Sequence, residues 1–316
     1  MSIPTVAALP RTARWIAATA VTGFVYSVVE TRAFVLRAAE VPVLPAGRAP
    51  VRVLHVSDLH LTPRQRLKQR WVRGLAALEP DAVIATGDFL GHRQAVEPVV
   101  DCLDGLLDRP GAFVLGSNDY YAPIVKNPAR YLMPGGQDRH HLGDRLPWRD
   151  LVRALTGRGW HDLSNRRVRL SVAGLELALV GVDDPHLSFD DLAAVSGPAP
   201  ADAELAVAVA HAPYLRVLDT FTSDGYGLVL AGHTHGGQLR VPGYGALVTN
   251  CDLDRHRARG LHRHRSAGRS SWLHVSAGLG TSPYAPVRFS CRPEATLLTL
   301  VPAGGQTRVG SAVRVG

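Results

Sequence analysis

The sequence predicts an α/β fold, because short apolar runs alternate with stretches of helical spacing along most of the chain. The runs are apolar throughout, which is typical of strands that are covered on both faces. The runs expected to form strands are Val51–Val56, Ala82–Ala85, Ala112–Leu115, Leu175–Val182, Leu205–Ala210, Leu228–Ala231 and Trp272–Val275. The stretches expected to form helices are Gln65–Leu78, Ala95–Leu107, Trp148–Thr156 and Tyr214–Thr220.

The N-terminal region contains an uncharged apolar run, Trp15–Val29, which follows Arg11 and Arg14. A run of about 15 residues is short for a membrane-spanning helix, which needs about 20. Three interpretations stay open: a membrane anchor or interfacial helix, a signal segment, and an amphipathic helix packed on the domain. Association with a membrane through this segment is the expected localisation, and a cytoplasmic or exported protein is the alternative.

The chain is expected to divide into three parts. Residues 1–40 form the hydrophobic anchor segment and lead-in, 41–303 the main domain and 304–316 a flexible tail. The proline-rich stretch Val41–Pro50 at the start of the main domain is expected to be a linker or an extended lead-in.

A net charge of +8 and a pI near 9.8 favour anionic partners such as phosphate esters, nucleic acids or acidic lipid surfaces. The segment Arg255–Arg265 concentrates arginine and histidine and is expected to be a solvated loop, with contact to anionic lipid headgroups or nucleic acid as the alternative. It lacks interleaved aromatic residues, which counts against binding of single-stranded nucleic acid. The three cysteines form no C-x-x-C pair, so any metal site must use histidine and oxygen ligands.

Polar side chains that can bind metals follow the apolar runs directly. At the carboxyl edge of an α/β sheet, where ligands usually bind, such residues lie close together. The segments are His55–His60, Ala85–Asp88, Leu115–Asp119, Ala210–Pro213 and Ala231–Gly237. Crowded carboxylates and imidazoles would repel one another or stay unsatisfied without a cation, so the set predicts a metal site.

Imidazole and carboxylate ligands without thiolate favour Mn, Fe, Zn or Co, and the set is too large for one tetrahedral ion. Two divalent ions bridged by one carboxylate fit best. Two ions about 3.5–4 Å apart can activate a bridging hydroxide and clamp phosphoryl oxygens.

The ordered motifs resemble the calcineurin-like metallophosphoesterases. They are Asp58-x-His60, Gly87-Asp88, Gly116-Ser117-Asn118-Asp119, His211 and Gly232-His233-x-His235. The strings Gly232–Gln238, Gly181–Pro185 and Val275–Phe289 are similar to a bacterial subgroup whose members often begin with a hydrophobic segment. The resemblance implies two mixed β-sheets packed as a sandwich, flanked by helices, with a dinuclear metal site at the sheet edge.

The resemblance also implies a ligand assignment. One ion would be held by Asp58, His60, Asp88 and His235. The second would be held by Asp88, Asn118, His211 and His233, so that Asp88 is the bridge.

The third motif departs from the family pattern, Gly-Asn-His followed by Asp or Glu. An ungapped overlay places Ser117 at the asparagine ligand and Asn118 at the histidine that assists catalysis. A one-residue slip, which we favour, keeps Asn118 as a ligand and places Asp119 at the catalytic position. His186 and His92 are further candidates for proton transfer. Arginines near the motifs that could hold a phosphate are Arg64, Arg93 and Arg288.

The expected activity is hydrolysis of phosphodiesters or phosphomonoesters, with a hydroxide between the two ions as the nucleophile. The apolar N-terminal run favours a lipid or cell-envelope phosphate ester as substrate and a membrane surface as partner. One alternative is a catalytically impaired metal-binding protein of the same fold, motivated by the altered third motif. A nucleic-acid-associated binding protein is the other, less favoured alternative.

Overall fold

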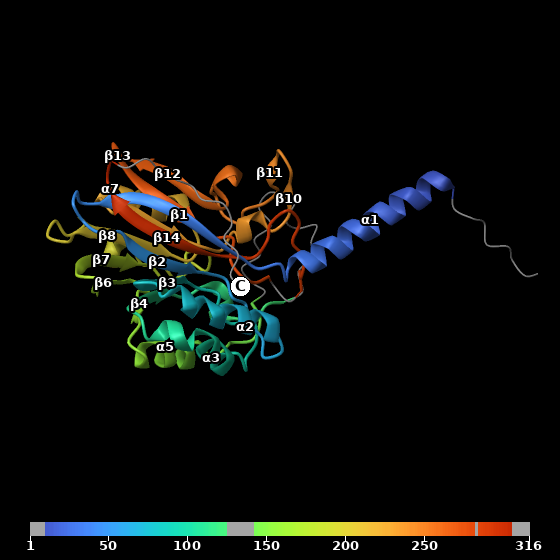
Figure 1. Ribbon diagram of the computed structural model, residues 1–316, viewed down its shortest axis with the longest axis horizontal. Coiled ribbons are helices and arrows are strands. Elements are labelled where there is room, and N and C mark those ends of the chain that lie inside the picture. The colour runs from blue at the N-terminus through green and yellow to red at the C-terminus, as the bar shows by residue number, and fades with distance from the viewer. Residues whose placement is uncertain (1–9, 125–141, 282–283, 305–316) are drawn as a thin grey trace, which may run out of the picture.

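The structure is a computed structural model that describes residues 10–124, 142–281 and 284–304 (Figure 1). In this part of the chain, two six-stranded sheets face each other and helices cover their outer faces. The predicted α/β sandwich is therefore confirmed. The ends of the chain, residues 1–9 and 305–316, lie outside the described residues, and the predicted flexible tail falls there except for Gly304.

The first sheet has the order β1-β14-β2-β3-β4-β5. Strands β2 to β5 run parallel, whereas β14 runs antiparallel to β2 and pairs in parallel with β1 at the edge. The bounds are β1 Val35–Leu44, β14 Glu294–Pro302, β2 Val51–Val56, β3 Ala82–Thr86, β4 Gly111–Val114 and β5 His161–Asp162.

The second sheet has the order β12-β13-β9-β8-β7-β6. Its four central strands are parallel, and an antiparallel strand closes each edge. The bounds are β12 Gly260–Ser266, β13 Arg269–Val275, β9 Leu228–Ala231, β8 Leu205–Ala210, β7 Leu175–Gly181 and β6 Arg166–Val172. A separate hairpin consists of β10 Arg240–Val241 and β11 Gly245–Ala246.

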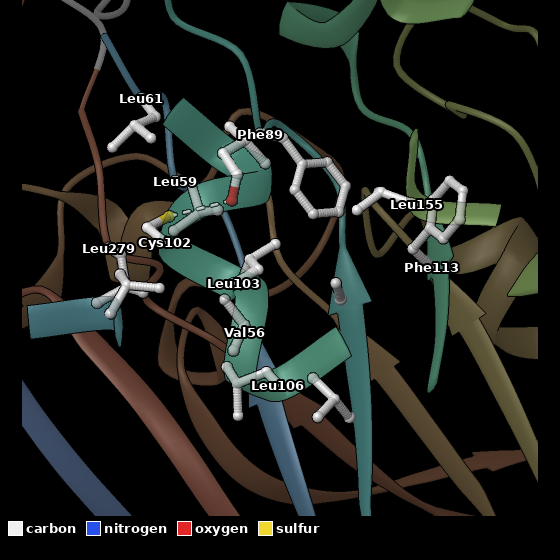
Figure 2. Packing of buried hydrophobic residues seen from close by; sticks show 14 of the residues in the cluster. Val56, Leu59, Leu61, Phe89, Cys102, Leu103, Leu106, Phe113, Leu155 and Leu279 are labelled. Carbon is white, nitrogen blue, oxygen red and sulfur yellow. Dashed lines mark hydrogen bonds between the residues drawn. The ribbon is translucent and has the colours of Figure 1, made fainter. Parts of the chain in front are cut away.

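Three apolar clusters hold the layers together. One fills the space between the sheets, and one lies under the helices on the outer face of each sheet. Figure 2 shows the cluster under α3, where Leu103 and Leu106 pack over Val56, and Phe89 lies near Phe113 and Leu155. The first sheet is covered by α2 Arg66–Gly74 with its extension η1 Leu75–Leu78, by α3 Val96–Leu107 and by α5 Trp148–Gly157; α7 Leu215–Asp224 covers the second. Two short helices, α4 Ser117–Tyr120 and α6 Leu192–Val195, lie in the connections.

Two segments were only partly anticipated by the sequence. The start of the stretch Val41–Pro50, expected to be a linker or an extended lead-in, is the end of β1, which pairs with β14 with a register shift between Pro42 and Leu44. The basic segment Arg255–Arg265 is not a single loop, since it consists of the short helix η4 Arg255–Arg257 followed by most of strand β12. In that strand His264 is buried, while Arg263 and Arg265 face solvent.

Helix α1, Arg11–Glu30, projects from the body of the molecule and is attached only near its C-terminal end (Figure 1). There, the Arg288 amide donates to the Ser27 carbonyl, and the Cys291 amide donates to the Glu30 carboxylate. The helix exposes large apolar side chains, namely Trp15, Val21, Phe24, Val25, Tyr26 and Val29. Across the described ranges, no helix combines the length and apolar character required to cross a membrane.

Candidate metal centre

The predicted ligands lie where strands of both sheets end. Asp58 and His60 follow β2, Asp88 follows β3 and Asn118 lies in α4, directly after β4. The second sheet contributes His211 after β8, together with His233 and His235 after β9. The position of one sheet relative to the other therefore sets the geometry of the site.

Four of these residues, Asp58, His60, Asp88 and His235, each place one ligand atom within 4.8 Å of the others. The His60 Nε2 atom lies 3.2 Å from His235 Nε2 and 3.3 Å from Asp88 Oδ2. The His235 Nε2 atom lies 3.6 Å from Asp58 Oδ1. Two imidazole nitrogens and two carboxylates at these separations can surround a divalent cation.

A second group of potential ligand atoms also contacts Asp88. The His211 Nε2 atom is 3.5 Å from Asp88 Oδ2 and 3.3 Å from His233 Nδ1. The Asn118 side-chain amide lies 2.8 Å from the same Asp88 oxygen, and its backbone amide donates to Asp88 Oδ1 at 2.7 Å. Asp88 is thus the residue shared by both groups.

Backbone carbonyls orient three of the imidazoles. His211 Nδ1 contacts Thr86 O at 2.7 Å, His233 Nε2 contacts Asn250 O at 3.3 Å, and His235 Nδ1 contacts Gly280 O at 3.1 Å. A carbonyl only accepts hydrogen bonds, so each of these nitrogens carries the proton and the opposite nitrogen keeps its lone pair for the site. Among the described residues, the buried His60 Nδ1 atom has no partner.

Burial determines the charge state of three of the four histidines, whereas the neighbouring Asp88 carboxylate raises the pKa of His211 against the effect of burial. Burial lowers the pKa of His60 to about 4 and lowers the pKa of His233 and of His235 well below the usual range, with neighbouring cationic or imidazole groups adding to the effect. The same burial raises the pKa of Asp58 to about 6. These three histidines are therefore neutral near pH 7, as metal ligation requires.

The backbone of the site is strained in a way that local packing must maintain. Five non-glycine residues adopt positive φ: Asp58 at 50°, His60 at 39°, Asp88 at 54°, His233 at 67° and His235 at 49°. Such conformations are uncommon outside glycine and cluster at functional sites. Gly116 is required for a different reason, since a Cβ atom there would lie 2.4 Å from Asp88 Oδ1.

Residues 51–237, more than half of the 316-residue chain, match the calcineurin-like phosphoesterases. The chain belongs to the calcineurin-like phosphoesterase family. The metal-ligand group of Asp58, His60, Asp88 and His235 lies within the matched region. Family membership supports hydrolase activity on phosphate esters and a requirement for divalent metal.

Similar proteins include both bacterial and vertebrate members. A bovine protein described as a transmembrane protein with metallophosphoesterase domain is 27% identical over 282 residues, 83% of this chain and 56% of its own length. The metallophosphoesterase YkoQ of Bacillus subtilis is 26% identical, with 80% of this chain and 84% of the relative covered. The phosphodiesterase YaeI of Escherichia coli is 26% identical, with coverages of 80% and 83%. The chain thus spans little more than half the length of the bovine relative.

In the third motif of this calcineurin-like phosphoesterase, Gly116–Asp119, each polar side chain contacts a different partner. Asn118 faces Asp88, whereas the Ser117 hydroxyl donates to the Asp184 carboxylate. The Asp119 carboxylate accepts from the backbone amides of Asp88 and Gly116 at 2.9 Å and of Leu90 at 3.0 Å. A catalytic role for Asp119 stays a prediction. Its hydrogen bonds connect the loop after β3, which carries Asp88, with the loop after β4, which carries Asn118.

Other candidates from the sequence occupy different environments. The His186 ring centroid is 4.6 Å from that of His233, so His186 borders the centre. His92 is exposed and accepts from the Gln94 amide. Arg288 is fully buried and donates to the carbonyls of residues 277, 278, 280 and 291. Arg288 therefore holds the loop behind His235 and is not a phosphate ligand.

A buried hydrogen-bonded chain behind Asp58 was not predicted from the sequence. His274 of the second sheet contacts His55 of the first, with 2.8 Å between their Nδ1 atoms, and His55 Nε2 lies 2.9 Å from the Thr86 hydroxyl. Thr86 donates to Ser57 at 2.6 Å, and Ser57 donates to Asp58 Oδ2 at 2.5 Å. This series of hydrogen bonds links the packing of the two sheets to the orientation of Asp58.

Replacing Ser57 with alanine is expected to weaken metal binding about 10- to 100-fold, the usual effect of losing a group that orients a ligand. Asp58 would keep the His233 amide but lose the Ser57 hydroxyl. Calorimetric titration of metal-free protein with Mn²⁺ or Zn²⁺ measures the change, with exposed Ser270→Ala as the control. Equal affinity in both variants would show that the chain does not orient Asp58.

Proposed function

We propose that the chain hydrolyses phosphodiesters or phosphomonoesters with two divalent ions, drawn from Mn, Fe, Zn or Co, held on either side of Asp88. The observation that best supports this proposal is that one carboxylate oxygen, Asp88 Oδ2, lies within 3.5 Å of His60 Nε2, of His211 Nε2 and of the Asn118 amide. Those three contacts come from both ligand groups. A carboxylate in that position favours a bridged pair of ions over a single one.

The roles of the residues follow from their placement. Asp58, His60 and His235 would complete the first site, and Asn118, His211 and His233 the second. Ions bound there would lower the pKa of water between them and neutralise the phosphoryl oxygens. The carbonyls of Thr86, Gly280 and Asn250 keep the imidazole lone pairs directed inward, so the protein supplies a preorganised site.

The activity is tested by loading metal-free protein with Mn²⁺, Fe²⁺, Zn²⁺ or Co²⁺ in turn. Each form is offered an aryl phosphodiester and an aryl phosphomonoester, and release of the aryl alcohol is followed. We expect turnover with at least one metal and none in the presence of chelator. Tight binding of two ions without turnover on either ester would instead favour the catalytically impaired metal-binding protein.

The position of Asn118 predicts which residue of the third motif is a ligand. Asn118→Ala is expected to weaken binding of the second ion about 10- to 100-fold, as loss of an orienting or ligating group does. Ser117→Ala should have a smaller effect, because Ser117 bonds Asp184 and not Asp88. Calorimetric titration distinguishes the two ions by stoichiometry. A larger effect for Ser117→Ala would support the ungapped overlay.

We propose that α1 associates with a membrane surface and that the substrate is a lipid or cell-envelope phosphate ester. Support comes from the exposed apolar side chains of α1 and from the net charge of +8. The contacts of Ser27 and Glu30 join α1 to residues 288–291, and Cys291 Sγ lies 3.3 Å from the His235 carbonyl. A helix resting on lipid would therefore hold the metal centre close to that surface.

Deleting residues 1–26 is expected to move the protein from the membrane fraction to the supernatant of lysed cells. The deletion removes most of α1 and keeps its docked turn, so hydrolysis of a soluble aryl phosphodiester should be retained. Immunoblotting of both fractions measures the change. Retention of the shortened protein in the membrane fraction would contradict a role for α1 in attachment.

A further inference from the structure

An open cavity of about 350 Å³ lies between the β10–β11 hairpin and the segment that contains η4. The cavity is polar and its charged side chains are all basic. The lining residues that matter here are Arg240, Tyr244, His256 and Arg259. None of them belongs to the ligand set of the metal centre.

Among the described residues, no carboxylate pairs with either guanidinium group in this cavity. Within the described ranges, neither Arg240 nor Arg259 forms an ion pair, and Arg240 donates through Nη1 to the Gly236 carbonyl at 2.8 Å. Burial lowers the pKa of Arg240, and the positive charge of Arg259 lowers it further. Some arginines elsewhere in the described ranges do pair with carboxylates, for example Arg158 with Asp104 and Asp108.

Carboxylates near the cavity are engaged with other groups. Glu294 binds Arg37 and accepts from the Ala277 amide. Asp254 accepts from the His256 amide at the start of η4. The guanidinium forks therefore retain N–H donors and positive charge that an incoming anion can satisfy, and a phosphate group matches the planar fork in geometry.

Apolar and aromatic side chains are exposed on the hairpin that lines the cavity and on the segments that flank it. The hairpin and its flanks expose Leu239, Val241, Tyr244, Leu247 and Phe289, each by more than a third of its surface. Tyr244 carries the Arg255 guanidinium 3.8 Å from its ring centroid. Phe289 packs edge-on against Tyr26 of α1 with 5.3 Å between ring centroids, so the apolar rim continues onto the exposed face of the helix.

We propose that the Arg240–Arg259 cavity binds the phosphate group of an anionic phospholipid, while the surrounding side chains enter the interfacial layer. A basic cavity bordered by exposed aliphatic and aromatic residues fits a lipid headgroup, whose phosphate lies next to apolar chains. A nucleic acid would leave the aliphatic rim in water. The inference rests on the membrane association proposed for α1 but not on hydrolysis.

The test compares partitioning of the metal-loaded, full-length protein onto two kinds of vesicle. One contains phosphatidylcholine alone, and the other contains phosphatidylcholine with phosphatidylglycerol. The ratio of the two partition coefficients isolates recognition of the anionic headgroup from the apolar contribution of α1. Arg240→Gln with Arg259→Gln should lower this ratio about thirtyfold, the loss expected for two arginines at an anionic surface.

A matched control removes the same charge elsewhere. Arg265→Gln with Arg269→Gln changes two exposed arginines at the end of β12 and β13 that lies away from the metal centre. The control should keep the ratio of the unmodified protein. An equal loss in the control, or no loss in the cavity variant, would overturn the proposal, because net charge or α1 alone would then explain binding.

Two further measurements distinguish the phosphate group and the metal centre. Inorganic phosphate should displace the protein from the anionic vesicles more strongly than chloride at matched ionic strength, and equal displacement would overturn phosphate recognition. Hydrolysis of a soluble aryl phosphodiester is also measured for each variant. Loss of lipid binding by the cavity can then be distinguished from loss of catalysis at the metal centre. If Arg240→Gln disturbs the Gly236 loop and abolishes hydrolysis, the ratio of partition coefficients measured for the single variant Arg259→Gln tests the proposal.

Discussion

Asp88→Ala is expected to reduce metal-dependent phosphoester hydrolysis by about 10³-fold or more, because an ion supplies several kcal/mol of charge stabilisation and each 1.36 kcal/mol is a factor of ten. Asp88 is within reach of both ligand groups, so its removal should weaken the two sites together. Steady-state kinetics with an aryl phosphodiester and metal analysis of the purified variant measure the two effects.

The control for this variant is Asp202→Ala, which removes an exposed carboxylate that pairs with Arg169 on the surface. It should keep both the metal content and the rate. An Asp88→Ala protein that retained two ions and normal turnover would contradict the bridging role.

Arg288→Ala is expected to lower the free energy of unfolding by about 3 kcal/mol, the scale set by leaving buried hydrogen-bonding groups unsatisfied. The Arg288 guanidinium donates to the carbonyls of Ala277 and Gly280 at 2.7 Å and of Cys291 at 3.1 Å. Gly280 also accepts from His235 Nδ1. Metal affinity should therefore fall together with stability, because the loop that orients His235 loses its buried support.

Urea-induced unfolding of metal-free protein measures the stability change, and exposed Arg269→Ala is the control. Arg288→Lys should restore only part of the loss, since an ammonium group cannot reproduce the planar fork. If Arg288→Ala and Arg269→Ala were equally stable, the buried guanidinium would not be what holds the loop.

The sequence predicts most central strands well because burial on both faces produces continuous apolar runs, but the central strand β14 is not among the expected ranges. Strands β2 and β8 coincide with the expected ranges Val51–Val56 and Leu205–Ala210. The edge strands lack this signal. In β12, histidines that face inward alternate with exposed arginines, and the side-chain period of two is hidden by a composition that suggests a loop. Strand β1 is not predicted from the sequence because Pro42 lies within it, which an edge strand tolerates.

For the candidate site, the sequence predicts the potential metal ligands but not the residues that hold them in place. Its ligands could be proposed from the sequence because each follows a recognisable apolar strand, and the structure brings all of them to one edge. The supporting residues could not, because contacts such as His55 with His274 and Arg288 with the 277–280 loop depend on how two sheets pack. Nothing in the sequence near His55 indicates a partner in the second sheet. Arg288 likewise looks like a phosphate ligand until its burial is known.

The most direct test of the account is a crystal structure of the Mn²⁺-loaded protein with anomalous diffraction data. Two anomalous peaks about 3.5–4 Å apart, with Asp88 between them, are expected. Asp58, His60 and His235 should surround one peak, and Asn118, His211 and His233 the other. A single peak, or two peaks that do not share Asp88, would contradict the bridged metal centre on which the proposed activity rests.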